Sequence, residues 1–333
     1  MSAPVPLPPQ PAGLDWPSHD WPRGAPPAGF REPAEGDLGK THALVVIWRG
    51  RLVHERYGPE HGPDSSLISW SVAKSFLHAA VGILVRDGKL ATQAPADVPE
   101  WQSPGDARRA ITLEQLLRMS SGLFWREDYV DAERSDVIEM LFGEGKADVA
   151  GFAASYPLEH APGTVWNYSS GTSNLISRIA GRALGGGDST AGFLRRALFE
   201  PLGMRSATAR CDEAGTWIGS SFVFASARDF ARFGYLYLRD GLWDGERILP
   251  EGWVDHARRV TPGSAEDLQA YGAHWWLPPG DEGMFSANGY AGQYLFVAPA
   301  RDVVVVRLGQ SSAEQAPHVR AWLRALVSLF PRL

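Results

Sequence analysis

The hydrophobic and polar positions divide the chain into a β-rich start, a helical middle and a β-rich end. Two apolar, β-branched runs at 42–48 and 52–57 surround an Arg-Gly-Arg turn, which predicts a β-hairpin. Similar runs at 273–277, 292–297 and 303–308 predict strands near the C-terminus. Strands at both ends of the chain therefore predict one sheet assembled from both ends.

Residues between these strands show apolar positions at helical spacing. The clearest helix starts at Ser71 and stops at Gly88, and because it is apolar on most sides we expect it to be buried. Thr112 and Gln115 form a capping box at the start of another helix. Further helices are predicted at 148–156, 173–184, 191–202, 227–239, 251–260 and 318–330.

The order of the elements predicts an α+β fold: an antiparallel sheet flanked by helices, with an all-helical lobe inserted. Ten of the 25 prolines lie in the first 33 residues, which should be extended, and Trp16 and Trp21 favour docking of that segment onto the body. We expect four segments: a Pro-rich extension at 1–33, the first part of the α/β lobe at 34–85, a mainly helical lobe at 86–221 and the second part of the α/β lobe at 222–333.

Composition narrows the function classes. With 333 residues, a net charge of −6 and 44% hydrophobic residues, the chain has the balance of a soluble globular protein, and mild acidity argues against nucleic acid or membrane as a partner. No apolar stretch approaches the roughly 18 residues of a membrane span, and the N-terminus lacks a secretory pattern, which predicts a cytoplasmic protein. The sequence does not indicate an oligomeric state.

Cysteine and histidine usage argues against metals and cofactors. Cys211 is the single cysteine, so an internal disulfide and a cysteine-based metal cluster are excluded. The nine histidines include no i, i+4 pair, so we expect no metal and no cofactor. Cys211 itself is either a reactive thiol or, as we expect, a structural residue.

Lysine is scarce: only Lys40, Lys74, Lys89 and Lys146 occur among 32 basic residues. Lys74 lies three residues after Ser71 at the start of the predicted buried helix, so both side chains face the same way. A buried lysine can lose its proton and activate a serine hydroxyl, which arginine essentially cannot do. The alternative is a surface lysine in the first turn of a helix.

Two loop motifs could complete such a site. Tyr168, in a loop that leads into a helix, could relay a proton, or its ring could cap the core. The Gly-rich segment Asn288–Gln293 precedes a strand, so it could supply a backbone N–H to an oxyanion, or could be a simple turn between strands.

In order and separation, Ser71-x-x-Lys74, Tyr168-x-Ser170 and the Gly-rich segment resemble the serine β-lactamase and penicillin-binding-protein superfamily. The sequence is most similar to the class C β-lactamase-related hydrolases of the 6-aminohexanoate-dimer hydrolase branch. The resemblance extends over roughly residues 14–310 and includes SWSVAKSF, ITLEQLLRMSSGL and PGTVWNYSSGTSNL. It implies a β-lactamase/transpeptidase-like fold with the active site between the sheet and the helical lobe.

The resemblance also implies roles for individual residues. Ser71 would be the nucleophile, Lys74 its base and Tyr168 the relay to the leaving group, with Ser71 and Gln293 backbone N–H groups as the oxyanion hole. Tyr129, Ser170, Tyr290 and Gly292 would contact the substrate.

Two positions depart from the β-lactamase pattern. Ser170 replaces the asparagine of Y-x-N, and Tyr290-Ala291-Gly292 replaces K-T-G, which removes the cation that binds an antibiotic's carboxylate. We therefore expect a serine hydrolase that cleaves a linear amide or small ester through an acyl-serine intermediate. The alternatives are a binding or sensor module with little catalysis, and a D-amino-acid peptidase. Five tryptophans could line an apolar cleft for an uncharged acyl chain, although half or more of them should be core: Trp70, Trp125, Trp166, Trp275 and Trp276.

Overall fold

A seven-stranded antiparallel sheet organises the larger lobe of the computed structural model, which describes residues 5–129, 135–185, 189–264, 269–279 and 283–333. Its strand order is β2-β1-β12-β11-β10-β9-β8. The strands of this sheet are β1 (Lys40–Trp48), β2 (Arg51–Tyr57), β8 (Ala270–Tyr271), β9 (Trp276–Leu277), β10 (Phe285–Gly289), β11 (Gln293–Ala298) and β12 (Val303–Gln310). A three-stranded sheet contains β3 (Leu67–Ile68), β5 (Val223–Ala225) and β4 (Thr208–Ala209), and a small hairpin contains β6 (Leu242–Trp243) and β7 (Glu246–Arg247).

The two ends of the chain meet in the middle of the large sheet. β1 pairs with β2 on one side and with β12 on the other, in the register Val45↔Val306. Residues Leu44–Ile47 and Val303–Val306 are fully buried, because both faces of these central strands are covered. The predicted α+β fold with one sheet built from both ends is therefore confirmed.

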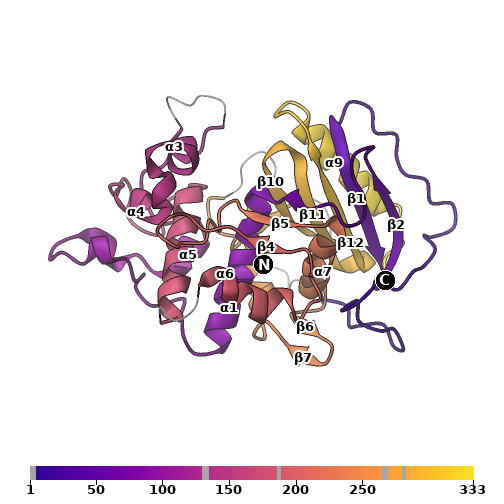
Figure 1. Cartoon of the computed structure of the whole chain (residues 1–333), viewed down its shortest axis with the longest axis horizontal. Coiled ribbons are helices and arrows are strands. Elements are labelled where there is room, and N and C mark those ends of the chain that lie inside the picture. The colour runs from indigo at the N-terminus through magenta and orange to yellow at the C-terminus, as the bar shows by residue number, and fades with distance from the viewer. Residues whose placement is uncertain (1–4, 130–134, 186–188, 265–268, 280–282) are drawn as a thin grey trace.

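Helices cover both faces of this sheet and form the second lobe (Figure 1). The described α-helices are α1 (Ala73–Arg86), α2 (Leu113–Leu117), α3 (Asp136–Phe142), α4 (Val149–Ala154), α5 (Ser170–Ala183), α6 (Thr190–Leu194), α7 (Ala227–Leu238), α8 (Trp253–Arg258) and α9 (Ala316–Ser328). α9 packs on one face in a cluster with Leu44, Val46 and Phe296, and α7 packs on the other face with α1. Short 3₁₀ segments occur at Trp70–Val72, Pro99–Trp101, Ala107–Ala110, Glu144–Ala147, Tyr290–Gly292 and Pro299–Arg301.

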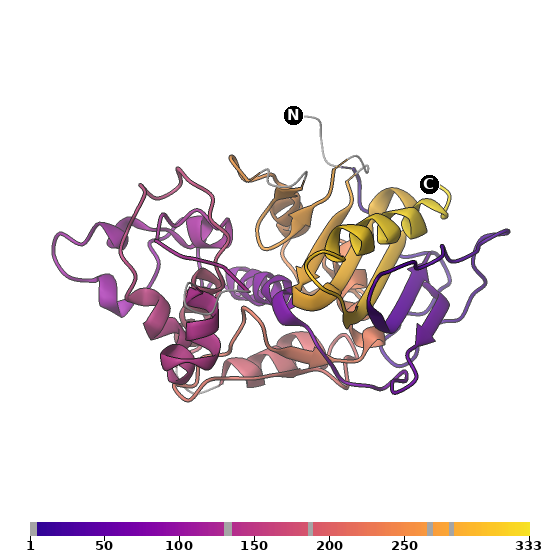
Figure 2. The same ribbon diagram turned by 90° about the horizontal axis from the view of Figure 1, so that it is seen from above.

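Helix α1 lies between the two lobes. Seen from above, it runs through the middle of the molecule, with α3, α4 and α5 on one side and the large sheet on the other (Figure 2). The first twelve residues of α1, Ala73–Leu84, are all buried, as the apolar pattern predicts. The N-terminal end of this helix is therefore held rigidly where the lobes meet.

The Pro-rich start of the chain is extended and docked on α7. Trp21 is buried and its Nε1 donates to the carbonyl oxygen of Arg228 at 3.2 Å. Arg232 Nε donates to the carbonyl oxygen of Pro17, and Arg239 Nη1 to that of Pro8. The docking predicted from the two tryptophans is confirmed.

Two predicted elements differ from the structure. The run 273–277 does not form one strand, because His274 has a φ of 57° and makes a tight turn between β8 and β9. The predicted helix 191–202 is interrupted, since α6 ends at Leu194 and a π-helical turn follows at Arg195–Phe199. Within the described residues, no helix combines the length and the hydropathy needed to cross a membrane.

Candidate active site

The turn before α1 presents Ser71 at the junction of the two lobes. Trp70–Val72 form a 3₁₀ turn that runs directly into α1. Trp70 has a φ of 43°, a left-handed conformation that is strained for a bulky side chain and is common at functional sites. The three-residue spacing from Ser71 then places Lys74 on the same side of the helix as the serine.

Lys74 is buried and fully hydrogen-bonded. Its Nζ lies 3.0 Å from Ser71 Oγ, 2.9 Å from Ser170 Oγ and 3.0 Å from the carbonyl oxygen of Ser220. These are all three bonds that an ammonium can donate. Burial lowers the pKa of Lys74 to about 8, while the negative charge of Glu127 acts in the opposite direction. Lys74 is therefore buried and loses its proton more easily than an exposed lysine, as the sequence predicts. The alternative of a surface lysine in the first turn of a helix is excluded.

Tyr168 closes the other side of the Ser71–Lys74 pair. Lys74 Nζ lies over its ring, 4.9 Å from the centroid, and the phenol is near enough to Ser71 for the serine side chain to act on its pKa. The ring packs on Tyr271 and Trp276, whose centroids are 5.7 and 5.4 Å away. Burial raises the pKa of Tyr168 well above its usual value, and Glu127 raises it further. Tyr168 is therefore a neutral phenol at physiological pH.

Glu127 is a functional-site residue that the sequence analysis did not identify. Its carboxylate accepts from the Ser170 backbone N–H at 2.8 Å and the Ser170 hydroxyl at 2.5 Å, from Trp125 Nε1 at 2.6 Å, and from the Tyr129 hydroxyl at 2.6 Å. Ser170 thus accepts a bond from Lys74 and passes its own hydrogen to Glu127. A carboxylate two residues before Tyr129 is the one local signal that could have pointed to it.

The Gly-rich third motif forms the turn between β10 and β11. Gly289 packs so closely on the turn before α1 that a Cβ there would lie 2.4 Å from the Ser69 carbonyl oxygen and 3.3 Å from the Ser71 nitrogen. Tyr290 is the next residue and lines the same cavity as Ser71. The structure therefore brings the start of this turn, Gly289 and Tyr290, against Ser71.

Gln293 and Gly292 lie behind the turn. Gln293 is buried, its backbone pairs with Gly289, and its side-chain amide donates to the carbonyl oxygens of Tyr290, Ala291 and Gly309. Gly292 has a φ of 88°, and its carbonyl oxygen accepts from the buried Arg307. Neither residue lines the cavity, whereas Tyr290, which we also expected to contact the substrate, lies there beside Ser71. The predicted oxyanion role of the Gln293 backbone N–H stays a prediction.

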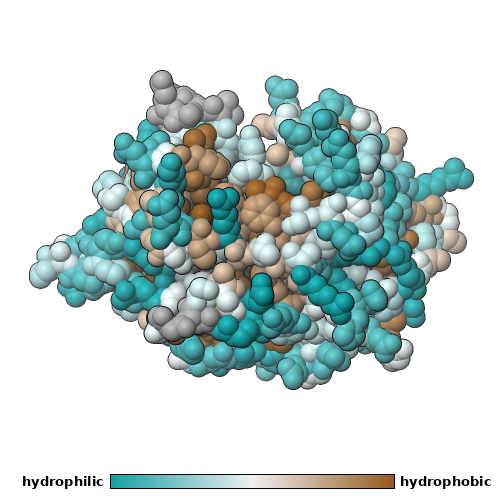
Figure 3. Space-filling view, in the orientation of Figure 1, coloured by the Kyte–Doolittle hydropathy of each residue, from teal (hydrophilic) through white to brown (hydrophobic). Residues whose placement is uncertain are grey.

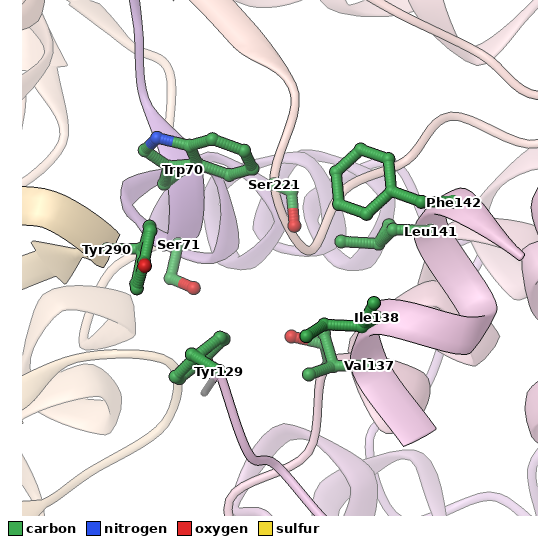
Figure 4. A pocket seen from close by; sticks show the side chains of 10 residues that line it. Trp70, Ser71, Tyr129, Val137, Ile138, Leu141, Phe142, Ser221 and Tyr290 are labelled. Atoms are coloured by element: carbon green, nitrogen blue, oxygen red, sulfur yellow. The ribbon is translucent and has the colours of Figure 1, made fainter. Parts of the chain in front are cut away.

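A cavity of about 220 Å³ opens beside Ser71. Figure 4 shows Trp70, Ser71, Tyr129 and Tyr290 on one side of it and the α3 side chains on the other. The lining residues are Trp70, Ser71, Tyr129, Val137, Ile138, Leu141, Phe142, Ser170, Ser221 and Tyr290. Tyr129 packs its ring against Tyr290 at 5.2 Å, so the predicted substrate-binding residues Tyr129, Ser170 and Tyr290 meet at this cavity.

Comparison with known proteins agrees with this geometry. The profile of the Beta-lactamase family matches residues 38–329, which include every part of the site. The chain belongs to the Beta-lactamase family. A 6-aminohexanoate-dimer hydrolase from Paenarthrobacter ureafaciens is 27% identical over 301 residues, which cover 85% of this chain and 75% of that protein. A lovastatin esterase from Penicillium rubens is 30% identical over 145 residues, 37% of this chain and 33% of the esterase.

Solved structures share the fold. A Bacillus anthracis protein provisionally named 6-aminohexanoate-dimer hydrolase superposes with a TM-score of 0.76 at 24% identity, covering 87% of this chain and 80% of that chain. A Bacillus halodurans penicillin-binding protein superposes with a TM-score of 0.68 at 19% identity, covering 87% and 98% of the respective chains. Family and relatives together make this chain a serine hydrolase of amides or esters, as the sequence resemblance implied.

Within this family, the cavity differs from one built for a carboxylated antibiotic. No charged side chain lines it in the described part of the chain. Arg307, which contacts the third motif at Gly292, is buried behind the turn, where it donates to backbone carbonyls of Gly292, Leu38 and Lys40. Arg307 therefore supports the turn from behind and is not one of the described lining residues of the cavity.

The five tryptophans named from the sequence divide between site and core. Trp70 lines the cavity, Trp166 and Trp276 lie half-buried beside Tyr168, and Trp125 and Trp275 are buried. Two of the five are therefore core, fewer than the half or more that we expected, and the apolar lining of the cavity comes mostly from α3.

Two remaining expectations concern metals and the lone cysteine. Among the residues that the structure describes, no group of three or more His, Cys, Asp or Glu side chains is arranged to hold a metal ion. Cys211 is half-buried, and burial together with Asp212 raises the pKa of its thiol. A raised pKa keeps the thiol protonated, which supports a structural rather than a reactive Cys211.

Proposed function

We propose that Ser71 forms the acyl-enzyme and that Lys74 is the base that activates it. The observation that carries this proposal is the 3.0 Å contact between Lys74 Nζ and Ser71 Oγ in a buried setting that lowers the lysine pKa to about 8. Once neutral, Lys74 has one lone pair facing three oxygens. The Ser220 carbonyl has no hydrogen to give and the Ser170 hydroxyl gives its own to Glu127, so the proton comes from Ser71.

The proton then returns to the leaving group through Tyr168. Tyr168 lies next to Ser71 and under Lys74, and its raised pKa keeps it a neutral phenol. It therefore acts as a proton donor and relay, and Lys74 remains the base. Attack of Ser71 Oγ on the carbonyl carbon forms the C–O bond of the tetrahedral intermediate. Breaking the bond to the leaving nitrogen or oxygen, with proton transfer to it, yields the acyl-serine. Water then hydrolyses the ester and releases the acid.

For the oxyanion hole we propose the backbone N–H groups of Ser71 and Tyr290. The close packing of Gly289 on Ser69 and Ser71 positions Tyr290 at the rim of the cavity, next to the nucleophile. Two preorganised N–H donors at such a place stabilise the negative oxygen of the tetrahedral intermediate. Only glycine at 289 permits this approach, because any Cβ would meet the Ser69 carbonyl oxygen.

Glu127 has a positioning role in this proposal. Its carboxylate accepts a hydrogen bond from the Ser170 hydroxyl, whose oxygen accepts one from Lys74 Nζ. The carboxylate also accepts a hydrogen bond from the Tyr129 hydroxyl at the cavity wall. One carboxylate therefore orients both the base and a substrate-contacting ring. Its charge also partly offsets the lowering of the Lys74 pKa by burial. Glu127 therefore helps to set the pH at which Lys74 becomes neutral.

The substrates that fit this site are linear amides and small esters. The relatives named for 6-aminohexanoate dimer and lovastatin are an amide and an ester hydrolase, and the described lining residues offer no charged partner for an antibiotic's carboxylate. A binding module without catalysis is disfavoured by the burial of Lys74 beside Ser71, since burying an unused ammonium costs stability. A D-amino-acid peptidase remains the second candidate, and the Streptomyces D-stereospecific amidohydrolase shares the fold.

Active-site labelling tests the proposal. A fluorophosphonate should add to Ser71, located by mass spectrometry, and Ser71→Ala should abolish both labelling and hydrolysis of p-nitrophenyl esters. Ser155→Ala, at the end of α4 and exposed, is the control and should behave as wild type. Full esterase activity in Ser71→Ala would overturn the assignment of the nucleophile. Turnover of D-alanyl amides above that of linear acyl amides would favour the peptidase.

A further inference from the structure

The cavity beside Ser71 has an unusual wall. Helix α3 contributes four apolar side chains, Val137, Ile138, Leu141 and Phe142, and the opposite wall is aromatic. Figure 3 shows apolar side chains gathered on this face of the molecule over α3 and toward β10, with hydrophilic residues around them. Large apolar side chains at a cavity mouth, such as Phe142 at 56% exposed, mark a ligand site rather than ordinary surface.

The α3 wall is held in place before any ligand binds. Ser135 caps the helix by accepting from the Ile138 N–H at 3.0 Å. Asp136, which is buried, accepts from the Arg126 backbone N–H at 2.7 Å and guanidinium at 2.9 Å, and from the Tyr156 hydroxyl at 2.9 Å. The polar anchors of α3 thus point away from the cavity, and its apolar residues are presented to Ser71. A preorganised wall loses little entropy when a chain packs on it.

The position of Tyr168 decides which half of a substrate enters the cavity. Tyr168 and Lys74 do not line it, and Tyr168 packs instead on Tyr271, Trp166 and Trp276. The leaving group must meet the proton donor, so it lies on the Tyr168 side. The acyl group, which stays bonded to Ser71, therefore lies in the cavity on the other side.

We propose that this cavity is the acyl site and that it selects uncharged, linear apolar acyl chains of medium length. The proposal rests on the acyl-enzyme function proposed above. A cavity of 220 Å³ compares with roughly 150 Å³ for one that encloses benzene, so it holds chains of about six to eight carbons. Each methylene buried should improve kcat/KM by roughly fourfold until the cavity is full.

The same wall excludes a charged chain end. An ammonium at the tip of a six-carbon chain would lie among Val137, Ile138 and Leu141, with no charged or carboxylate partner among the described lining residues. Burying an unpaired charge is far more costly than burying a methyl group. The site should therefore prefer a hexanoyl over a 6-aminohexanoyl group by about 100-fold or more, in contrast to the substrate for which the Paenarthrobacter relative is named.

A chain-length series tests the proposal. We expect kcat/KM for p-nitrophenyl acetate, butyrate, hexanoate, octanoate and dodecanoate to rise about 100-fold or more from acetate to hexanoate and to level off or fall beyond octanoate. The p-nitroanilides of hexanoic and 6-aminohexanoic acid measure the discrimination against charge. A profile that is flat from acetate to octanoate, or equal turnover of the two anilides, would overturn the acyl-site assignment.

A charge-inserting pair of variants localises the effect. Ile138→Asp should lower activity on hexanoyl esters about tenfold or more and raise activity on the 6-aminohexanoyl anilide about tenfold, because a carboxylate then faces the ammonium. Val260→Asp changes another partly exposed apolar side chain, 49% exposed and outside the cavity, and should leave both activities unchanged. If Ile138→Asp does not change the ratio of hexanoyl ester activity to 6-aminohexanoyl anilide activity, α3 is not the acyl wall.

Failure of this proposal and failure of the acyl-enzyme function are distinguishable. If fluorophosphonate labels Ser71 and esters are hydrolysed without a chain-length preference, only the acyl site is wrong. If Ser71 is not labelled and no ester is turned over, the proposed function itself is wrong.

Discussion

The two sides of Ser71 are built from opposite kinds of side chain. On one side Lys74, Glu127 and Ser170 form a connected chain of hydrogen bonds between charged and polar groups. On the other side the α3 wall and the aromatic rim carry no charge. The polar side can therefore perform the same proton transfers on any ester or amide, whereas the apolar side decides which acyl group is presented to it.

The largest effect should follow from removing the base on the polar side. Lys74→Met keeps the length of the side chain but cannot accept a proton, and Lys74→Arg keeps the charge but cannot lose it. We expect both to lower kcat/KM on hexanoyl esters by roughly 10⁴-fold, measured by burst and steady-state kinetics. Near-wild-type acylation in Lys74→Arg would show that a permanent cation suffices and that Lys74 is not the base.

Tyr168→Phe should have the next largest effect. It removes the hydroxyl beside Ser71 but keeps the ring under Lys74, so the packing on Tyr271 survives. We expect acylation to slow by about 10²- to 10⁴-fold, more for amides than for p-nitrophenyl esters, because p-nitrophenolate leaves without protonation. Equal losses on amides and activated esters would contradict the relay to the leaving group.

Glu127→Gln should shift the pH profile as well as the rate. In the wild type, kcat/KM should rise with pH toward a plateau above about 8, because Lys74 must be neutral to act. Loss of the Glu127 charge removes an influence that raises the lysine pKa, so the rise should move to lower pH, with a plateau reduced about 10- to 100-fold. Ser170→Ala breaks the hydrogen-bond link between Lys74 and Glu127 but keeps the Glu127 charge. Its pH profile should therefore not move to lower pH through loss of that charge. An unshifted profile in Glu127→Gln would refute the electrostatic role.

The smallest effect concerns stability. The pKa of Lys74 is lower in the folded protein than in the unfolded chain, so between about pH 8 and 10.4 the unfolded chain binds more protons and wild-type stability rises with pH. Relative to Lys74→Met, the wild type should gain about 3 kcal/mol across that window and nothing below it. Urea unfolding of both proteins at pH 7 and pH 10 measures this. A constant difference between them would show that the lysine pKa is not lowered.

The parts of the site that the sequence predicted are those defined by local spacing. Ser71 and Lys74 are one helical turn apart, so a local rule places them together, and burial followed from the apolar run after them. Glu127 escaped prediction because its partner Ser170 is 43 residues away and the carboxylate lies in an irregular loop. The family resemblance assigned the second oxyanion donor to Gln293 from its position after Gly292. We propose Tyr290 instead, because Gly289 packs on Ser69 and Ser71, a contact between distant segments that the sequence does not show.

The sequence by itself determined the family and the α+β order of elements, and it predicted Ser71 as the nucleophile and Lys74 as its base. Each of these depends on periodicity, on motif order or on side chains within one helical turn. The tertiary structure alone decided that α3 forms the acyl wall, that Glu127 supports Ser170 and that Arg307 lies behind the turn. These features depend on contacts between segments far apart in the chain. Such contacts form only when the sheet and helical lobe pack around α1, and no local pattern records them.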